Sequence, residues 1–123
     1  MNNRIWMIVA AVLLALAVGI GAFGAHGLQP TLEANGRMDT FETAVKYHFY
    51  HALGLLFFAI WKQLQPPVKH LNLSYLLLMI GILIFSGSLY VLSITGITWL
   101  GAITPFGGVA FIAGWLNLIR VKA

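Results

Sequence analysis

Residues 5–23 read IWMIVAAVLLALAVGIGAF, an apolar stretch without a single charged side chain. A helix of about 20 such residues crosses the hydrocarbon core of a bilayer, so the stretch predicts a membrane-spanning helix. A signal peptide is the alternative, because Arg4 precedes the stretch near the amino terminus. The apolar core of a signal peptide is usually shorter, at about 7–15 residues, and no clean cleavage signal follows here. Because further apolar stretches come later in the chain, we expect this helix to be retained.

The composition of the whole chain is that of a membrane protein. Of its 123 residues, 60% are hydrophobic and 8% are charged, which is too little charge to cover a soluble domain. The formal charge of +4 rests on seven Lys and Arg residues, too few for the basic surface of a nucleic-acid-binding protein. The chain has no cysteine, which excludes disulfides, thiolate catalysis and cysteine-based metal sites.

Three further stretches have the composition of membrane helices, at about residues 40–61, 73–94 and 105–119. Asp39 and Asn72 are the expected N-caps of the first two, and Thr104 is that of the last, with proline directly after it. The last helix is short, at roughly 22 Å. We expect residues 95–103 before it to dip into the membrane interface.

The positions of the basic residues predict the orientation of the chain. Cytoplasmic loops of membrane proteins are enriched in Lys and Arg. Arg37 and Lys46 fall on one side of the predicted spans, and the larger group falls on the other side: Arg4, Lys62, Lys69, Arg120 and Lys122. The sequence therefore predicts a single all-α domain over residues 1–123. It is a four-transmembrane-helix bundle with both termini in the cytoplasm.

Small residues recur along several of the predicted helices. Because lipid tails do not drive helices together, close packing in a membrane needs such residues. We expect a tight bundle, with self-association into a homo-oligomer through the same faces as the alternative. The stripes are Ala11, Ala15 and Gly19; Ala17, Gly21 and Ala25; Gly81 and Ser88; and Gly107, Ala110 and Gly114.

Polar side chains gather toward the end of the bundle that is expected to face outward. On a helix, Tyr47 and His51 share one face, and Lys46 marks the hydrocarbon boundary. The candidate ligand-binding residues are His26, Lys46, Tyr47, His51, Ser86, Ser88 and Thr104.

Three interpretations of this polar end stay open. In the first, His26 and His51 donate hydrogen bonds to helix-end carbonyls and lock the bundle, which makes the protein a structural or assembly component. In the second, the polar end binds or passes a small solute or a lipid. In the third, the weakest, His26, His48 and His51 hold a metal ion or haem, although no carboxylate supports them. No nucleophile elbow, carboxylate pair or phosphate loop is present, so we expect neither an enzyme nor a cofactor.

Several motifs follow one another along essentially the whole chain: residues 21–28 (GAFGAHGL), Thr43-Ala44, Tyr47, His51-Ala52-Leu53, residues 85–90 (FSGSLY), Thr95-Gly96, residues 104–108 (TPFGG) and Gly114-Trp115. Together they resemble a bacterial membrane-protein family known as domain of unknown function number 423. Its animal relatives are called transmembrane protein 256.

The resemblance implies a small multi-span protein of the bacterial cytoplasmic membrane, without a settled biochemical role. It singles out His26 and His51 as matching positions. At position 48 the family often has glutamine, which argues against the metal interpretation, since an amide does not replace an imidazole ligand. We expect a non-enzymatic membrane protein that binds or passes a small solute or lipid at its outer end.

Overall fold

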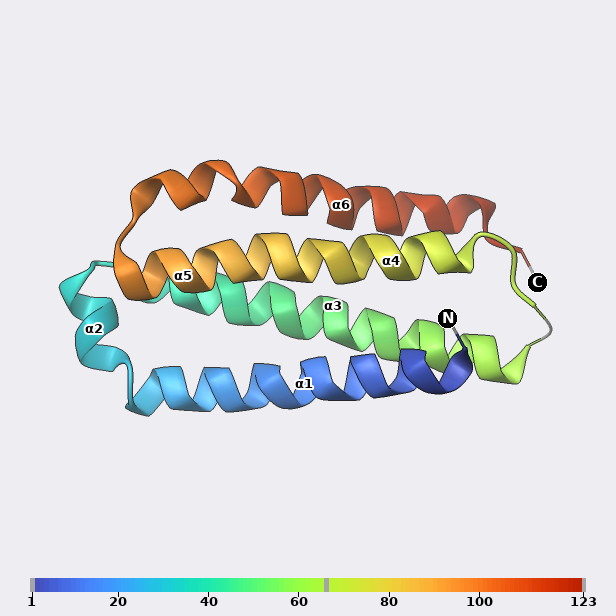
Figure 1. Ribbon diagram of the computed structural model, residues 1–123, viewed down its shortest axis with the longest axis horizontal. Helices are drawn as coiled ribbons and strands as arrows, with labels where there is room; N and C mark the ends of the chain where they lie inside the picture. Colours follow the sequence, from blue (N-terminus) through green and yellow to red (C-terminus); the bar gives the residue numbers. More distant parts are fainter. Residues whose placement is uncertain (1, 66, 123) are drawn as a thin grey trace.

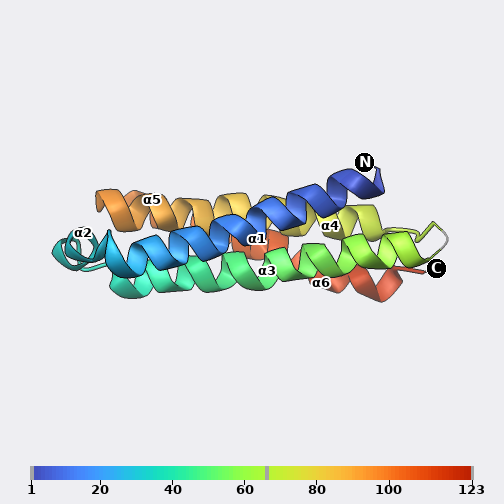
Figure 2. The same ribbon diagram turned by 90° about the horizontal axis from the view of Figure 1, so that it is seen from below.

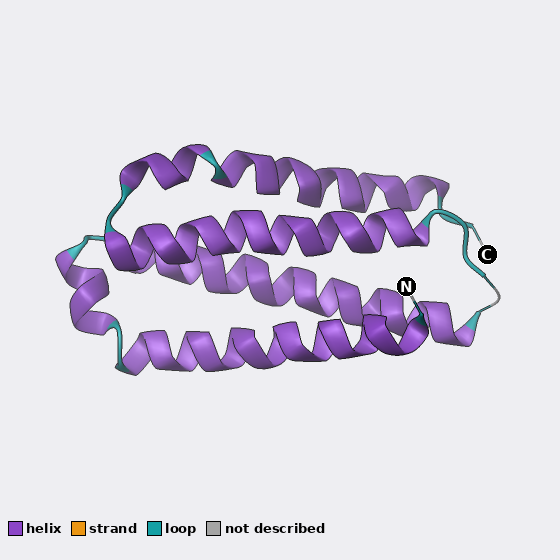
Figure 3. Cartoon of the chain, in the orientation of Figure 1, coloured by secondary structure: helices purple, strands orange, loops and turns teal. Residues whose placement is uncertain are grey.

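The computed structural model describes residues 2–65 and 67–122, and this part of the chain is helical apart from short connections (Figure 3). The all-α prediction is confirmed. The helices are α1 (Asn3–His26), α2 (Gln29–Ala34), α3 (Met38–Leu64), α4 (Leu71–Gly81), the π-helix η1 (Ile82–Ser86), α5 (Gly87–Thr95), the 3₁₀ helix η2 (Thr98–Ala102), α6 (Thr104–Asn117) and the 3₁₀ helix η3 (Leu118–Arg120).

The helices form four long rods that lie side by side (Figure 1). The rods are α1, α3, the continuous run α4–η1–α5, and the run η2–α6–η3. Short α2 closes one end of the bundle, and both termini lie at the other end. A backbone bridge between Lys69 and Lys122 ties the α3–α4 connection to the C-terminal segment.

Three of the rods are long and apolar enough to cross a membrane: Asn3–Gly24, Leu71–Thr95 and Thr98–Arg120. The last rod is longer than the short helix expected from the sequence, because η2 precedes α6 and extends it. With 27 residues α3 has sufficient length, but it is less apolar, since it carries two histidines and two lysines in its central and last turns.

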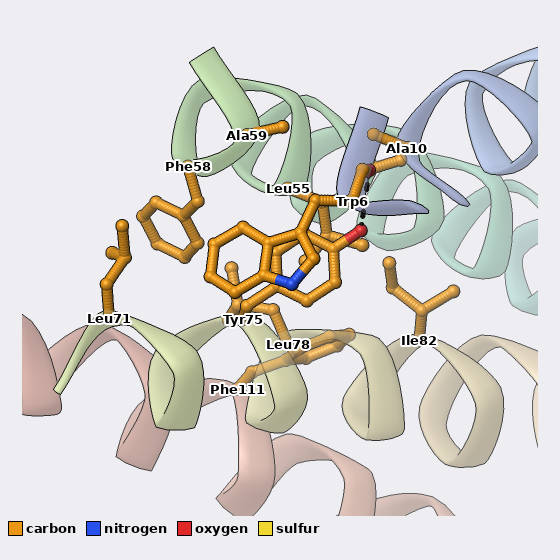
Figure 4. Close-up of a cluster of buried hydrophobic side chains, with 11 residues drawn as sticks. Trp6, Ala10, Leu55, Phe58, Ala59, Leu71, Tyr75, Leu78, Ile82 and Phe111 are labelled. Atoms are coloured by element: carbon orange, nitrogen blue, oxygen red, sulfur yellow. Dashed lines mark hydrogen bonds between the residues drawn. The ribbon is translucent and has the colours of Figure 1, made fainter. Parts of the chain in front are cut away.

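The core of the bundle takes side chains from all four rods (Figure 4). Trp6 of α1 stacks on Tyr75 of α4 with ring centroids 4.1 Å apart, and the Tyr75 hydroxyl donates to the Trp6 carbonyl over 2.7 Å. Leu55 and Phe58 of α3 and Phe111 of α6 complete the cluster, and all are buried. This cluster is what holds α1 against the other three rods near the termini.

Close packing through small residues is confirmed for part of the stripes. A Cβ at Gly107 would overlap the backbone nitrogen of Phe85, so α6 and η1 approach with backbones in contact. On α1, Ala17 and Gly24 are buried toward the bundle. The stripe of Ala11, Ala15 and Gly19 is exposed instead. The side chain of Ala25 lies outside the described part of the structure.

The three expected N-caps are wrong. Helix α3 begins at Met38, so Asp39 lies inside its first turn and no side chain caps it. Helix α4 begins at Leu71 after His70, which has a φ of 70°, and Asn72 lies inside the helix. Helix α6 begins at Thr104 itself, with Ile103 at the cap position, and Pro105 lies in the first turn as predicted.

Candidate functional site

Two of the predicted site residues, Tyr47 and His51, come together in a stack of rings. His51 is 7% exposed and lies against Phe111 of α6, with centroids 3.5 Å apart and planes 13° from parallel. Its Nδ1 donates to the carbonyl of Tyr47 over 2.7 Å, one turn back on α3. The Tyr47 ring packs against Phe85 at 4.7 Å and is 40% exposed. The imidazole of His51 is therefore engaged by packing on one face and by its own helix.

His48 is the most enclosed histidine of the described residues, with 3% of its surface exposed. Its Nε2 lies 2.8 Å from the carbonyl oxygen of Leu13 on α1, and its Nδ1 lies 2.8 Å from the hydroxyl of Tyr90 on α5. A carbonyl only accepts, so Nε2 carries the proton and Nδ1 accepts from the hydroxyl. This neutral imidazole joins three rods with both of its nitrogens.

The three predicted hydroxyl residues are also used in contacts between helices. Ser86 of η1 donates to the carbonyl of Ala44 on α3 over 2.8 Å. Ser88 of α5 and Thr104 of α6 share a hydrogen bond of 2.6 Å between their hydroxyls. In an apolar surrounding such groups need partners inside the protein, and here they find them in neighbouring rods.

His26 and Lys46 lie apart from these contacts. His26 is the last residue of α1 and is exposed, and Lys46 is exposed on α3. Among the described residues, no group of three or more histidine or carboxylate side chains lies close enough to hold a metal ion. The structure therefore does not assemble His26, His48 and His51 into the metal site of the third interpretation.

A groove at the α2 end of the bundle, which we call the α1–α2–α3 groove, has a volume of about 350 Å³. Its lining combines an apolar floor with polar side chains: Gly21, Gly24, Gln29, Leu32, Met38, Phe41, Glu42, Val45 and Lys46. A Cβ at position 24 would overlap the ring of Phe41, so a larger residue there would displace that ring. No histidine lines this groove, nor the grooves that Phe57, Arg4 and Val12 line elsewhere on the described surface.

Of the predicted site residues, Lys46 alone lines this groove. The sequence analysis predicted no helix between residues 23 and 40 and so missed the contribution of α2. The signal was present, since Pro30 in the first turn after Gln29 is typical of a helix start. The sequence analysis named Gly21 and Gly24 as part of a motif. In the structure both glycines line the groove.

Comparison with known proteins shows the family of this chain. Residues 20–108 match the family model described as "Protein of unknown function (DUF423)". The chain is 44% identical over 116 residues to the UPF0382 membrane protein YwdK of Bacillus subtilis, with 94% of each chain covered. It is 45% identical over 116 residues to the UPF0382 membrane protein SH2409 of Staphylococcus haemolyticus, covering 94% of this chain and 93% of the relative.

A more distant relative gives the location. The UPF0382 inner membrane protein YgdD of Escherichia coli is 36% identical over 126 residues, covering 99% of this chain and 95% of the relative. No solved structure gives a significant match. With a family model over most of the chain and full-length relatives, the chain belongs to the family described as Protein of unknown function (DUF423) and is a protein of the bacterial inner membrane.

Proposed function

We propose that this protein is a non-enzymatic, four-span membrane protein that binds a lipid in the α1–α2–α3 groove. The observation that carries the proposal is the lining of the groove, which combines apolar side chains with the charged Lys46 and Glu42. A membrane lipid combines an acyl chain with a charged headgroup, and this groove offers a surface to each part.

The fourth span of the proposal is α3. Its 27 residues extend about 40 Å, which is enough to cross a bilayer. Two of the polar groups that lower its apolarity, His48 and His51, do not face lipid, because they are buried between rods. Ionisable side chains inside a membrane are tolerated where they face the bundle interior and are hydrogen-bonded, as here.

The charged groups of the groove are available to a ligand. Glu42 and Lys46 lie one turn apart on α3, and both are exposed. The structure gives no hydrogen bond or ion pair between either side chain and another described residue. A headgroup at this level brings a phosphate for the ammonium of Lys46 and, in an ethanolamine lipid, an ammonium for the carboxylate of Glu42.

Photocrosslinking tests the proposal. The full chain is reconstituted in phosphatidylcholine vesicles with a diazirine-labelled phosphatidylethanolamine, and the labelled residues are mapped after irradiation. We expect labelling to concentrate on the groove residues and to fall several-fold in Val45→Phe, which fills the groove. Val18→Phe is the matched control, because Val18 is 60% exposed on α1 and lies outside the groove. Labelling spread evenly over the lipid-facing residues, and unchanged by Val45→Phe, rejects the proposal.

A structural or assembly role is the second candidate, and the hydrogen bonds of His48, Ser86 and Ser88 between rods favour it. Replacing His51 with glutamine separates the two. A purely structural role predicts that His51→Gln has a lower melting temperature than the unchanged protein. It also predicts that neither protein gives a specific lipid crosslink. The lipid-binding role predicts that the crosslink in the groove survives, since His51 does not line it.

We further propose that copies of this chain associate through the exposed stripe of Ala11, Ala15 and Gly19. Nothing lies within 4 Å of a Cβ built at Gly19, so this stripe is not used within the chain. If copies associate there, Gly19→Leu reduces the oligomer seen after crosslinking in membranes.

A further inference from the structure

A second groove lies at the opposite end of the bundle, where the termini are. There the N-terminal turns of α1 lie near the last turn of α3, and the two helices cross at an angle (Figure 2). The groove between these turns has a volume of about 610 Å³ and is lined by Asn3, Arg4, Met7, Ile8 and Gln63. We call it the basic-end groove. It does not share a residue with the α1–α2–α3 groove, and its ligand does not depend on that proposal.

The lining has the chemistry of a phosphate site above an apolar floor. Arg4 contributes a guanidinium, and Asn3 and Gln63 contribute amides. The structure gives none of these three side chains a hydrogen bond or ion pair with another described residue. Met7 and Ile8 continue the groove into the apolar part of α1. An arginine fork with neighbouring amides binds the oxygens of a phosphate by charge-assisted hydrogen bonds.

The electrostatics of this end are positive and uncompensated. The chain has three acidic residues, Glu33, Asp39 and Glu42, and all belong to the α2 end. The N-terminus of α1 also lies here, and its first turn contains no acidic side chain. The positive end of the 24-residue helix dipole therefore adds to the charge of Arg4, and no acidic side chain lies at this end to offset either.

We propose that the basic-end groove binds the headgroup phosphate of an anionic glycerophospholipid. The guanidinium of Arg4 and the amides of Asn3 and Gln63 hold the phosphate oxygens, and Met7 and Ile8 contact the start of an acyl chain. Charge complementarity at Arg4 and contact of an acyl chain with Met7 and Ile8 together select a lipid over a free anion, which can make only the first of these contacts.

The test compares lipids and anions on the full chain purified in mild detergent. The melting temperature is titrated with short-chain phosphatidylglycerol, with phosphatidylcholine of the same chain length, and with inorganic phosphate. We expect the melting temperature to rise with phosphatidylglycerol and not with phosphatidylcholine or inorganic phosphate. Stabilisation by inorganic phosphate at the same concentrations overturns the lipid as the occupant, and equal stabilisation by phosphatidylcholine overturns the anionic specificity.

Two pairs of variants locate the effect. Arg4→Gln is compared with Lys122→Gln, which removes the same charge at the same end of the bundle but outside the groove. Gln63→Leu is compared with Gln65→Leu, which changes an exposed amide outside the groove and leaves the charge unchanged. The melting temperatures without lipid show that each variant is folded.

We expect Arg4→Gln to weaken the phosphatidylglycerol response about tenfold or more, and Gln63→Leu to weaken it about threefold to tenfold. The two control variants should respond like the unchanged protein. The proposed site is rejected if Arg4→Gln and Lys122→Gln weaken the phosphatidylglycerol response equally while Gln63→Leu and Gln65→Leu leave it unchanged. That result would mean that the lipid is attracted by the basic surface as a whole.

Discussion

The hydroxyl of Tyr90 on α5 donates a hydrogen bond of 2.8 Å to Nδ1 of His48 on α3. The other ring nitrogen of His48 donates to the Leu13 carbonyl of α1, also over 2.8 Å. Because His48 is buried between the rods, no water replaces a lost partner, and the hydroxyl, the imidazole and the carbonyl depend on one another. This one side chain fixes how three of the four rods are placed.

Replacing His48 with alanine should therefore destabilise the protein more than the loss of a single hydrogen bond would. It leaves the Tyr90 hydroxyl and the Leu13 carbonyl without their partner and opens a cavity. We expect a loss of about 2–4 kcal/mol in the free energy of unfolding. Titration of the purified protein from mild detergent into a denaturing detergent measures this free energy.

The control is His48→Gln, whose amide can donate to Leu13 and accept from Tyr90. It should retain more stability than His48→Ala. Tyr90→Phe removes one hydrogen bond and should cost about 1 kcal/mol. If the effects of His48→Ala and Tyr90→Phe simply add in the double variant, the two side chains are not coupled and the interpretation is wrong.

A second prediction concerns the contact between α6 and η1. Gly107→Ala places a Cβ against the backbone of Phe85, 2.8 Å from its Cα, and backbone cannot turn away as a side chain can. We expect a loss of about 1–3 kcal/mol, measured by the same titration.

Gly19→Ala is the matched control for that change. Nothing lies within 4 Å of a Cβ built at Gly19, and alanine favours a helix over glycine. The control should leave the stability unchanged or slightly higher. Equal destabilisation by both variants would show that the two glycines do not differ in their packing.

The histidines show how far sequence reasoning reaches at the candidate site. Apolar length predicted the long helices well, because a bilayer imposes that length on any helix that crosses it. The pattern also placed Tyr47 and His51 on one face of α3. It did not predict that His48 would be the bridging residue, since its partners on α1 and α5 depend on the packing angles of other rods.

The groove residues were missed for a related reason. Apolar length predicted no helix between residues 23 and 40, because α2 is too short to give such a signal. The π-helix η1 was also not predicted, because no local pattern marks it. It carries Ser86 and Phe85, so the contacts of both α3 and α6 depend on a feature that helical periodicity does not encode.

A third prediction tests the buried hydrogen bonds between α4 and α6. Ser74 is fully buried and donates to the Gly114 carbonyl over 2.8 Å, and it lies 2.8 Å from Nδ2 of Asn117. Ser74→Ala should cost about 0.5–1.5 kcal/mol, which is the range for hydrogen bonds between membrane helices. Ser74→Cys, of similar volume, should cost less. A variant with alanine that is as stable as the unchanged protein would show that this contact contributes nothing.

The last prediction decides between three and four spans. The chain has no cysteine, so single cysteines report one position each. Glu33 and Thr98 lie at one end of the bundle, and Gln65 and Lys122 lie at the other, all exposed. If α3 crosses the membrane, Glu33→Cys and Thr98→Cys should react with a membrane-impermeant maleimide in spheroplasts. Gln65→Cys and Lys122→Cys should react only after the membrane is opened, because the more basic end remains in the cytoplasm.

The reverse pattern of labelling would keep four spans and invert the orientation. Equal reactivity of positions 33 and 65 would mean that α3 does not cross, and its buried histidines would then belong to a helix that lies along the membrane surface.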